Sequence, residues 1–114
     1  MAGTGGNVTN AAVLILSTAP TREEAEAIAR VLVEEKLAAC VQLSPVESWY
    51  RWEGKVEQTT EIRLDIKTTE SLAAAVESRV GEIHSYAVPE LIRIRIAGGG
   101  AAYLDWIGRE TQQG

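Results

Sequence analysis

The stretch from residue 39 to residue 68 constrains the fold most, because it predicts one unusually long β-hairpin. In its second arm, apolar residues alternate with charged ones over residues 61–67, which is the period of a strand that buries one face. Glu53 and Gly54 lie between the arms, and the glycine can adopt the positive φ of a tight hairpin turn. Arms of this length reach roughly 40 Å at about 3.3 Å per residue, about twice the usual strand length. A single subunit of this size cannot cover such a hairpin.

The tip of the hairpin carries three large aromatic residues, Trp49, Tyr50 and Trp52. A soluble monomer rarely leaves so much aromatic surface in contact with water. Aromatic side chains are enriched in the buried centres of subunit contacts. We therefore expect these residues, together with Trp106, to lie in the interface of a homo-oligomer. Stacking on nucleic-acid bases is disfavoured by the acidic charge balance and by the absence of an RNA-recognition signature.

Composition restricts the class of protein and its partners. The chain has 114 residues and a formal net charge of −5. This length suits one domain, which we expect at residues 11–112, after a disordered tail at residues 1–10. The negative charge argues against nucleic acid or an anionic membrane as a partner and favours cations. The single cysteine, Cys40, excludes an internal disulfide, and the N-terminal apolar run is too short for a membrane span and lacks a signal peptide's basic residues. We predict a soluble, cytoplasmic protein.

The other elements are predicted from periodicity and capping. A continuous apolar run is typical of a central strand buried on both faces, and Thr21 with Glu24 has the form of a helix capping box. The expected elements are a strand at 12–16, a helix from 22 to about 36, a helix from about 70 to 84, a strand at 92–96 and a short amphipathic helix at 101–110.

With the hairpin included, this order is βαββαβ plus a short C-terminal helix. It is the ferredoxin-like, split βαβ pattern of the α+β class. Both main helices then lie on one face of a four-stranded antiparallel sheet and leave the other face open. We expect self-association to close that open face.

Two kinds of candidate site stand out. His84 is the only histidine, and its simplest role is that of a helix C-terminal residue favoured by the helix dipole. Cys40 is expected to be a small packing residue or, less simply, a metal ligand beside His84. No nucleophile–base pair, Walker motif or dinucleotide motif is present, so we predict that the protein is not an enzyme.

A second group combines a lysine, a tyrosine and two carboxylates. Glu61 and Lys67 occupy odd positions of the second hairpin arm and share a face, while Tyr86 and Glu90 lie on the loop before the last strand. Converging in a cleft, these residues would bind a small anion or a complexed metal. A solvated ion-pair network at a subunit interface explains the same residues equally well.

Several short strings, in this order and spacing, resemble the CutA divalent-cation-tolerance family. They are Ser17-Thr18-Ala19-Pro20, the stretch 35–41, Tyr50-x-Trp52-Glu53-Gly54-Lys55, the stretches 66–68 and 84–91, and Tyr103-Leu104-x-Trp106. The resemblance covers roughly residues 13–107. It implies a homotrimer of ferredoxin-like subunits, similar in architecture to the PII signal proteins. It also implies a role in tolerance of divalent metals, with copper the metal usually named.

The chain departs from the family pattern at its metal-ligand positions. Ser17 stands where some bacterial members have cysteine, and Ile83 where they have histidine. A serine hydroxyl is a poor copper ligand. The predicted metal ligands are therefore His84, with Cys40 and Glu90, and the metal is not needed for folding. The alternatives are a trimeric sensor of a small anion or nucleotide in an intersubunit cleft, and a structural trimer that anchors partner proteins.

Overall fold

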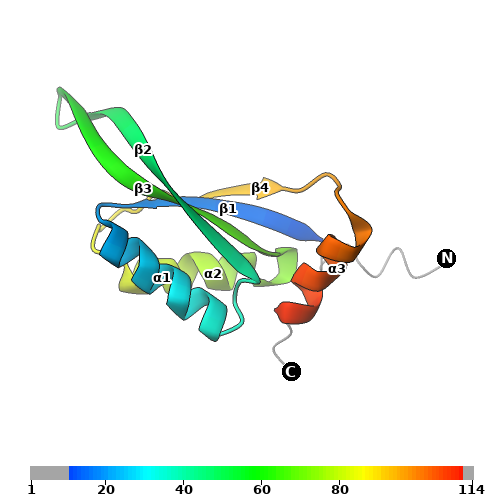
Figure 1. Cartoon of the computed structure of the whole chain (residues 1–114). Helices are drawn as coiled ribbons and strands as arrows, with labels where there is room; N and C mark the ends of the chain where they lie inside the picture. Colours follow the sequence, from blue (N-terminus) through cyan, green and yellow to red (C-terminus); the bar gives the residue numbers. More distant parts are fainter. Residues whose placement is uncertain (1–10, 112–114) are drawn as a thin grey trace.

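The structure is a computed structural model that describes residues 11–111 (Figure 1). Its elements are β1 (Ala12–Ala19), α1 (Arg22–Glu34), β2 (Cys40–Trp52), β3 (Lys55–Thr69), α2 (Glu70–Ile83), β4 (Ile92–Arg95) and α3 (Ala101–Glu110). The strands form one antiparallel sheet in the order β2-β3-β1-β4. Both α1 and α2 lie on the same side of this sheet (Figure 1). The predicted α+β fold is confirmed, while the tail predicted at residues 1–10 lies outside the described residues.

The long hairpin is present as predicted, and it dominates the shape of the molecule. Its strands pair from Cys40 opposite Lys67 to Trp52 opposite Lys55. Both turn residues have positive φ, 51° at Glu53 and 80° at Gly54, as a two-residue hairpin turn that matches the strand twist requires. The hairpin projects beyond the helices (Figure 1), and the molecule measures 54 × 25 × 21 Å.

The hydrophobic core lies between the sheet and the two main helices. Odd-numbered residues of β1 and even-numbered residues of β3 share the inner face because the strands pair in that register. Each large apolar side chain buried there stabilises the fold by about 1.5–3 kcal/mol. The fully buried members include Val13, Ile15, Leu64 and Ile66 from the sheet, Ile28 and Leu32 from α1, and Val76 and Val80 from α2.

The opposite face of the sheet carries apolar side chains with little cover. Leu14 and Leu16 are half-buried, and Ile92 and Ile94 of β4 are 47% and 42% exposed. Only one face of β1 is therefore buried in a single copy, and burial of its other face, which we expect from self-association, stays a prediction. The reason for the sparse cover is that α1 and α2 both lie on the other side of the sheet (Figure 1), while α3 meets this side through the contact of Tyr103 with Lys67.

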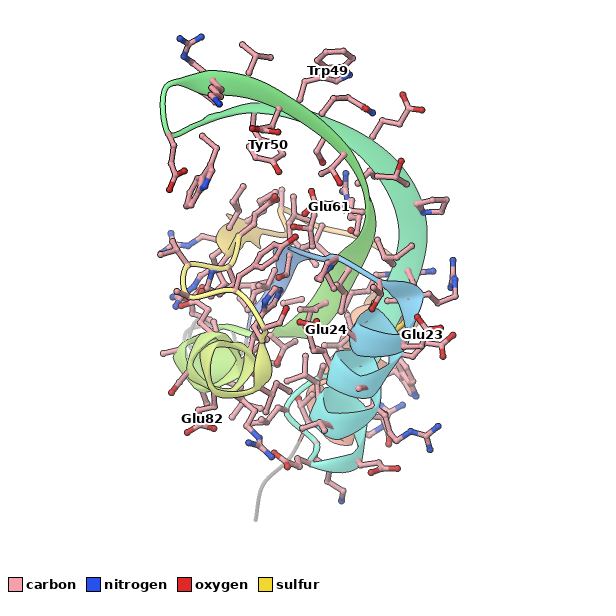
Figure 2. All side chains as sticks on the ribbon, turned by 90° about the vertical axis from the view of Figure 1, so that its left-hand side faces the viewer. Glu23, Glu24, Trp49, Tyr50, Glu61 and Glu82 are labelled. Carbon is pink, nitrogen blue, oxygen red and sulfur yellow. The ribbon has the colours of Figure 1, made fainter. Side chains whose placement is uncertain are left out.

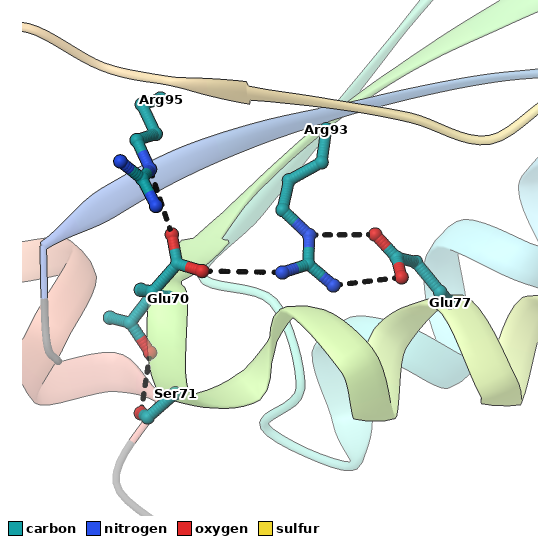
Figure 3. A network of polar contacts seen from close by, with 6 residues as sticks. Glu70, Ser71, Glu77, Arg93 and Arg95 are labelled. Carbon is teal, nitrogen blue, oxygen red and sulfur yellow. Dashed lines mark hydrogen bonds and ion pairs between the residues drawn. The ribbon is translucent and has the colours of Figure 1, made fainter.

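Arginines on β4 tie this short edge strand to α2 (Figure 3). Arg93 makes two hydrogen bonds of 2.9 Å to the Glu77 carboxylate and one of 3.2 Å to Glu70. Arg95 lies 3.8 Å from the other Glu70 oxygen. These contacts turn the arginine side of β4 toward the helices, which leaves its isoleucines on the opposite face.

Candidate functional site

A cleft of about 880 Å³ lies between the hairpin and the loop that follows α2. Figure 2 views this end of the molecule, with Tyr50 and Glu61 facing the space under the curved hairpin. Its polar and aromatic lining comprises Glu47, Glu61, Glu90, Thr18, Ser48, Ser85, Trp49, Tyr50, Trp52 and Tyr86. No lysine or arginine of residues 11–111 belongs to the lining. The cleft is therefore acidic and aromatic.

Glu61 is the buried carboxylate of this cleft. Glu61 is only 8% exposed, and its carboxylate accepts a 2.7 Å hydrogen bond from the Ser48 hydroxyl. The Tyr86 hydroxyl lies 3.5 Å from its other oxygen. Within the described part of the chain, no Lys, Arg or His forms an ion pair with it. A buried carboxylate with hydroxyl donors alone has little compensation for its lost hydration.

Tyr86 forms the facing wall. Burial, followed by the nearby negative charge of Glu61, raises the pKa of the Tyr86 phenol above its ordinary value of 10.0. The phenol therefore keeps its proton at neutral pH and donates toward Glu61. The pair offers a negative oxygen and a neutral hydroxyl oxygen to a ligand in the cleft.

His84 lies directly behind this wall, and its side chain is fully buried. Its Nε2 lies 2.7 Å from the carbonyl oxygen of Thr18, and its Nδ1 lies 3.0 Å from the backbone nitrogen of Tyr86. Because a carbonyl only accepts and a backbone N–H only donates, this network assigns the hydrogen to Nε2 and leaves Nδ1 as the acceptor. Both ring nitrogens thus have partners inside the protein.

The predicted metal ligands do not come together within one chain. Cys40 is at the opposite end of the sheet, where it pairs with Lys67, and Glu90 lines the cleft. Among residues 11–111, no three His, Cys, Asp or Glu side chains are placed to hold a metal ion. The residues present therefore do not fit a copper centre within one chain. A site shared between copies stays a prediction.

The second predicted group is brought together in part. Glu61, Tyr86 and Glu90 line the cleft, as the hypothesis required. Lys67 shares the face of Glu61 but lies six positions further along β3, where its Nζ is 3.2 Å from the Tyr103 hydroxyl. Its ammonium also lies 5.3 Å from the centre of the Tyr103 ring. Lys67 thus stands outside the cleft of its own chain.

The sequence interpretation missed several lining residues, namely Thr18, Glu47, Ser48 and Ser85. A signal for Ser48 was available. A two-residue turn at 53–54 fixes the register of the hairpin, so Val46 lies opposite Glu61 and Ser48 follows on the same face. No comparable signal existed for Thr18 or Ser85, because their approach depends on tertiary packing.

The aromatic residues predicted for an interface differ in exposure. Trp49 and Trp52 are 71% and 59% exposed, and Tyr50 is 43% exposed. Trp106 is half-buried and stacks on Tyr103 with ring centres 5.5 Å apart. Their role in assembly stays a prediction, because the structure contains one chain.

The described residues contain no helix long and apolar enough to span a membrane. Related proteins carry different compartments in their names. A protein of Arabidopsis thaliana, 43% identical over 101 residues, is named "Protein CutA, chloroplastic", and this chain spans 56% of its length. A solved structure from Archaeoglobus fulgidus is described as a periplasmic divalent cation tolerance protein. Cytoplasmic location therefore stays a prediction.

The sequence and the fold match the same family. The family model described as "CutA1 divalent ion tolerance protein" matches residues 13–110 of this chain. The Thermus thermophilus protein named "Divalent-cation tolerance protein CutA" is 43% identical over 99 residues, which cover 86% of this chain and 96% of that protein. The Archaeoglobus fulgidus structure superposes with a TM-score of 0.87 at 42% identity, covering 89% of this chain and 99% of the other. A CutA structure from Xylella fastidiosa also gives a TM-score of 0.87, at 45% identity over 89% and 98% of the two chains. None of these names carries an enzymatic activity. The chain belongs to the CutA1 divalent ion tolerance family.

Proposed function

We propose that this protein binds a divalent cation through oxygen ligands in the cleft, as its part in divalent-cation tolerance. The observation that carries the proposal is Glu61, a buried carboxylate that faces the cleft without a cationic partner among the described residues. Glu47 and Glu90 add negative charge to the same cleft. Mg²⁺ is commonly held by one or two carboxylates while it keeps several waters, so a complete set of protein ligands is not required.

The choice of cation follows from the donor atoms. Carboxylate and hydroxyl oxygens suit Mg²⁺ and Mn²⁺, whereas copper favours imidazole and thiolate. His84 uses both nitrogens internally, and Cys40 lies at the other end of the sheet. The copper hypothesis for His84, Cys40 and Glu90 therefore requires ligands from more than one copy. We expect the cleft to bind hard cations in preference to copper.

We also propose that three copies assemble through the open face of the sheet and the hairpin tip. The exposed Trp49 and Trp52, with the exposed isoleucines of β4, support this proposal because their burial would remove much apolar area from water. The small-anion alternative depends on the same assembly, since Lys67 would have to reach the cleft of another copy. A purely structural trimer remains the third hypothesis.

Calorimetric titration tests these functions against one another. Mg²⁺, Mn²⁺, Cu²⁺ and ATP are titrated separately into the wild type, Glu61→Gln and the control Glu57→Gln. Glu57 lies on the same strand but is exposed and outside the cleft lining. We expect saturable Mg²⁺ or Mn²⁺ binding that is at least about tenfold weaker in Glu61→Gln and unchanged in the control. Loss of a direct carboxylate ligand should cost at least as much as loss of an outer-shell partner, which typically lowers metal affinity about 10–100-fold.

Other outcomes assign a different function. Copper binding that is lost in Cys40→Ala but kept in Glu61→Gln would move the site to the ligands expected from the family resemblance. ATP binding that is lost in Lys67→Ala would support the anion sensor. No binding by the wild type in any titration would overturn the proposal and leave the structural trimer.

A further inference from the structure

The backbone of the loop that follows α2 is held by two side chains, those of His84 and Glu24. The backbone N–H of Tyr86 donates to His84 Nδ1 at 3.0 Å, and the N–H of Ser85 donates to the Glu24 carboxylate at 2.8 Å. His84 in turn donates from Nε2 to the Thr18 carbonyl at 2.7 Å. Two consecutive backbone amides are thus fastened to α1 and β1, which are far away in sequence.

These contacts also set the orientation of Tyr86. Its ring packs against the His84 imidazole with centroids 5.0 Å apart and planes tilted by 44°. At the other end of the Tyr86 side chain, the hydroxyl lies 3.5 Å from the Glu61 carboxylate. One imidazole therefore holds Tyr86 by its backbone and by its ring, while the hydroxyl is left to the cleft.

We propose that His84 is a positioning residue, which fixes Tyr86 against Glu61, and that it is not itself a metal ligand. The inference rests on the proposed function, because it assigns His84 a role in shaping that cleft. Two observations support it. The His84 side chain is fully buried. A metal on Nδ1 would also take the lone pair that the Tyr86 N–H now uses, and would leave that amide without its acceptor.

Three substitutions separate the functions of the two ring nitrogens. His84→Asn places a carbonyl oxygen near the position of Nδ1 and keeps an acceptor for the Tyr86 N–H. His84→Gln instead reaches the position of Nε2 and keeps a donor for the Thr18 carbonyl. His84→Ala removes both contacts. Circular dichroism establishes that each variant is folded before it is compared.

The measurements are amide hydrogen exchange at Tyr86 and the dissociation constant for Mn²⁺. Loss of one hydrogen bond corresponds to about a fivefold change in an equilibrium constant. We expect exchange at Tyr86 to be at least about fivefold faster in His84→Gln and His84→Ala than in the wild type. The Mn²⁺ dissociation constant should rise by a similar factor in these two variants. In His84→Asn, exchange at Tyr86 should stay within about twofold of the wild type, and the Mn²⁺ dissociation constant should rise less than in the other two variants.

Two results would overturn the inference. Equal loss of Mn²⁺ binding in all three variants, with unchanged exchange at Tyr86, would identify His84 as a ligand. Faster amide exchange at Tyr86 with unchanged Mn²⁺ affinity in His84→Gln and His84→Ala would show that His84 stabilises the loop but does not shape the binding site.

Failure of the proposed function is distinguishable from failure of this inference. It would appear as unchanged Mn²⁺ binding in Glu61→Gln or as no binding by the wild type. Amide hydrogen exchange at Tyr86 then tests the positioning role without any cation. It should be faster in His84→Ala and His84→Gln than in His84→Asn, which keeps an acceptor for this amide. Equal exchange in all three variants would refute the positioning role.

Discussion

Ser17 offers a sharp test of the energetics of the core. Its side chain is fully buried on the inner face of β1, opposite Leu64, and its hydroxyl has no hydrogen-bond partner within residues 11–111. A buried polar group without a partner costs about 1–3 kcal/mol. We therefore predict that Ser17→Ala stabilises the protein.

The expected magnitude is the difference between two effects. Alanine removes the penalty of the unpaired hydroxyl but also removes one heavy atom from a packed site. Each lost contact is worth about 0.1–0.2 kcal/mol, so roughly five of them offset less than about 1 kcal/mol. The net prediction is an increase of about 1 kcal/mol in the free energy of unfolding.

Thr68→Val is the matched control. Thr68 is also fully buried on the inner face of the sheet, but its hydroxyl donates a 2.6 Å hydrogen bond to the Leu37 carbonyl. Valine keeps the shape and removes the donor, so this variant should lose about 1–2 kcal/mol. Urea unfolding followed by tryptophan fluorescence, at one fixed protein concentration, measures both variants. A Ser17→Ala protein no more stable than the wild type would refute the claim that this hydroxyl lacks a partner.

Two further predictions concern assembly and pH. Trp52→Ala should weaken self-association by about 3 kcal/mol per copy, because it removes apolar surface that is exposed in one copy and that assembly would bury. Sedimentation velocity over a dilution series measures this effect, with Gln58→Ala as the control. If the Trp52→Ala assembly resists dilution as well as the control does, Trp52 is not part of the interface. The raised pKa of Tyr86 means that the folded protein holds the phenol proton more tightly than the unfolded chain. Its contribution to stability is fully present below about pH 10 and is lost as the pH rises through the folded-state pKa. Stability should therefore fall less steeply above pH 10 in Tyr86→Phe, and equal slopes in urea titrations would contradict this assignment.

Local signals in the sequence were sufficient for most of the fold. Gly54 marked the hairpin turn, and Thr21 accepts a hydrogen bond from the Glu24 N–H at the start of α1, as a capping residue does. The carboxylate of Glu24, however, does not complete a capping box. It binds the Ser85 amide, 61 positions away, and such a partner has no local signature.

Periodicity could not decide which face of a strand meets the helices. The alternation in β4 is clear, but it is the arginines that turn toward α2 while Ile92 and Ile94 remain exposed. The same limit affected the candidate site. Odd numbering placed Glu61 and Lys67 on one face, yet they lie six positions apart along β3, opposite Val46 and Cys40 of β2 respectively. His84 was expected at a helix end, where it lies, but its contact with Thr18 joins residues 66 positions apart.

Because of the hairpin, the structural order of one part of the protein depends on the protein concentration. Every residue from 49 to 58 is exposed, and an isolated two-stranded ribbon is only marginally stable in water. In the trimer that we propose, neighbouring copies supply the missing contacts, so the order of this ribbon is set by mass action. Its aromatic residues form one wall of the cleft. Dilution should therefore loosen the binding site before it unfolds the core, which couples ligand affinity to the abundance of the protein.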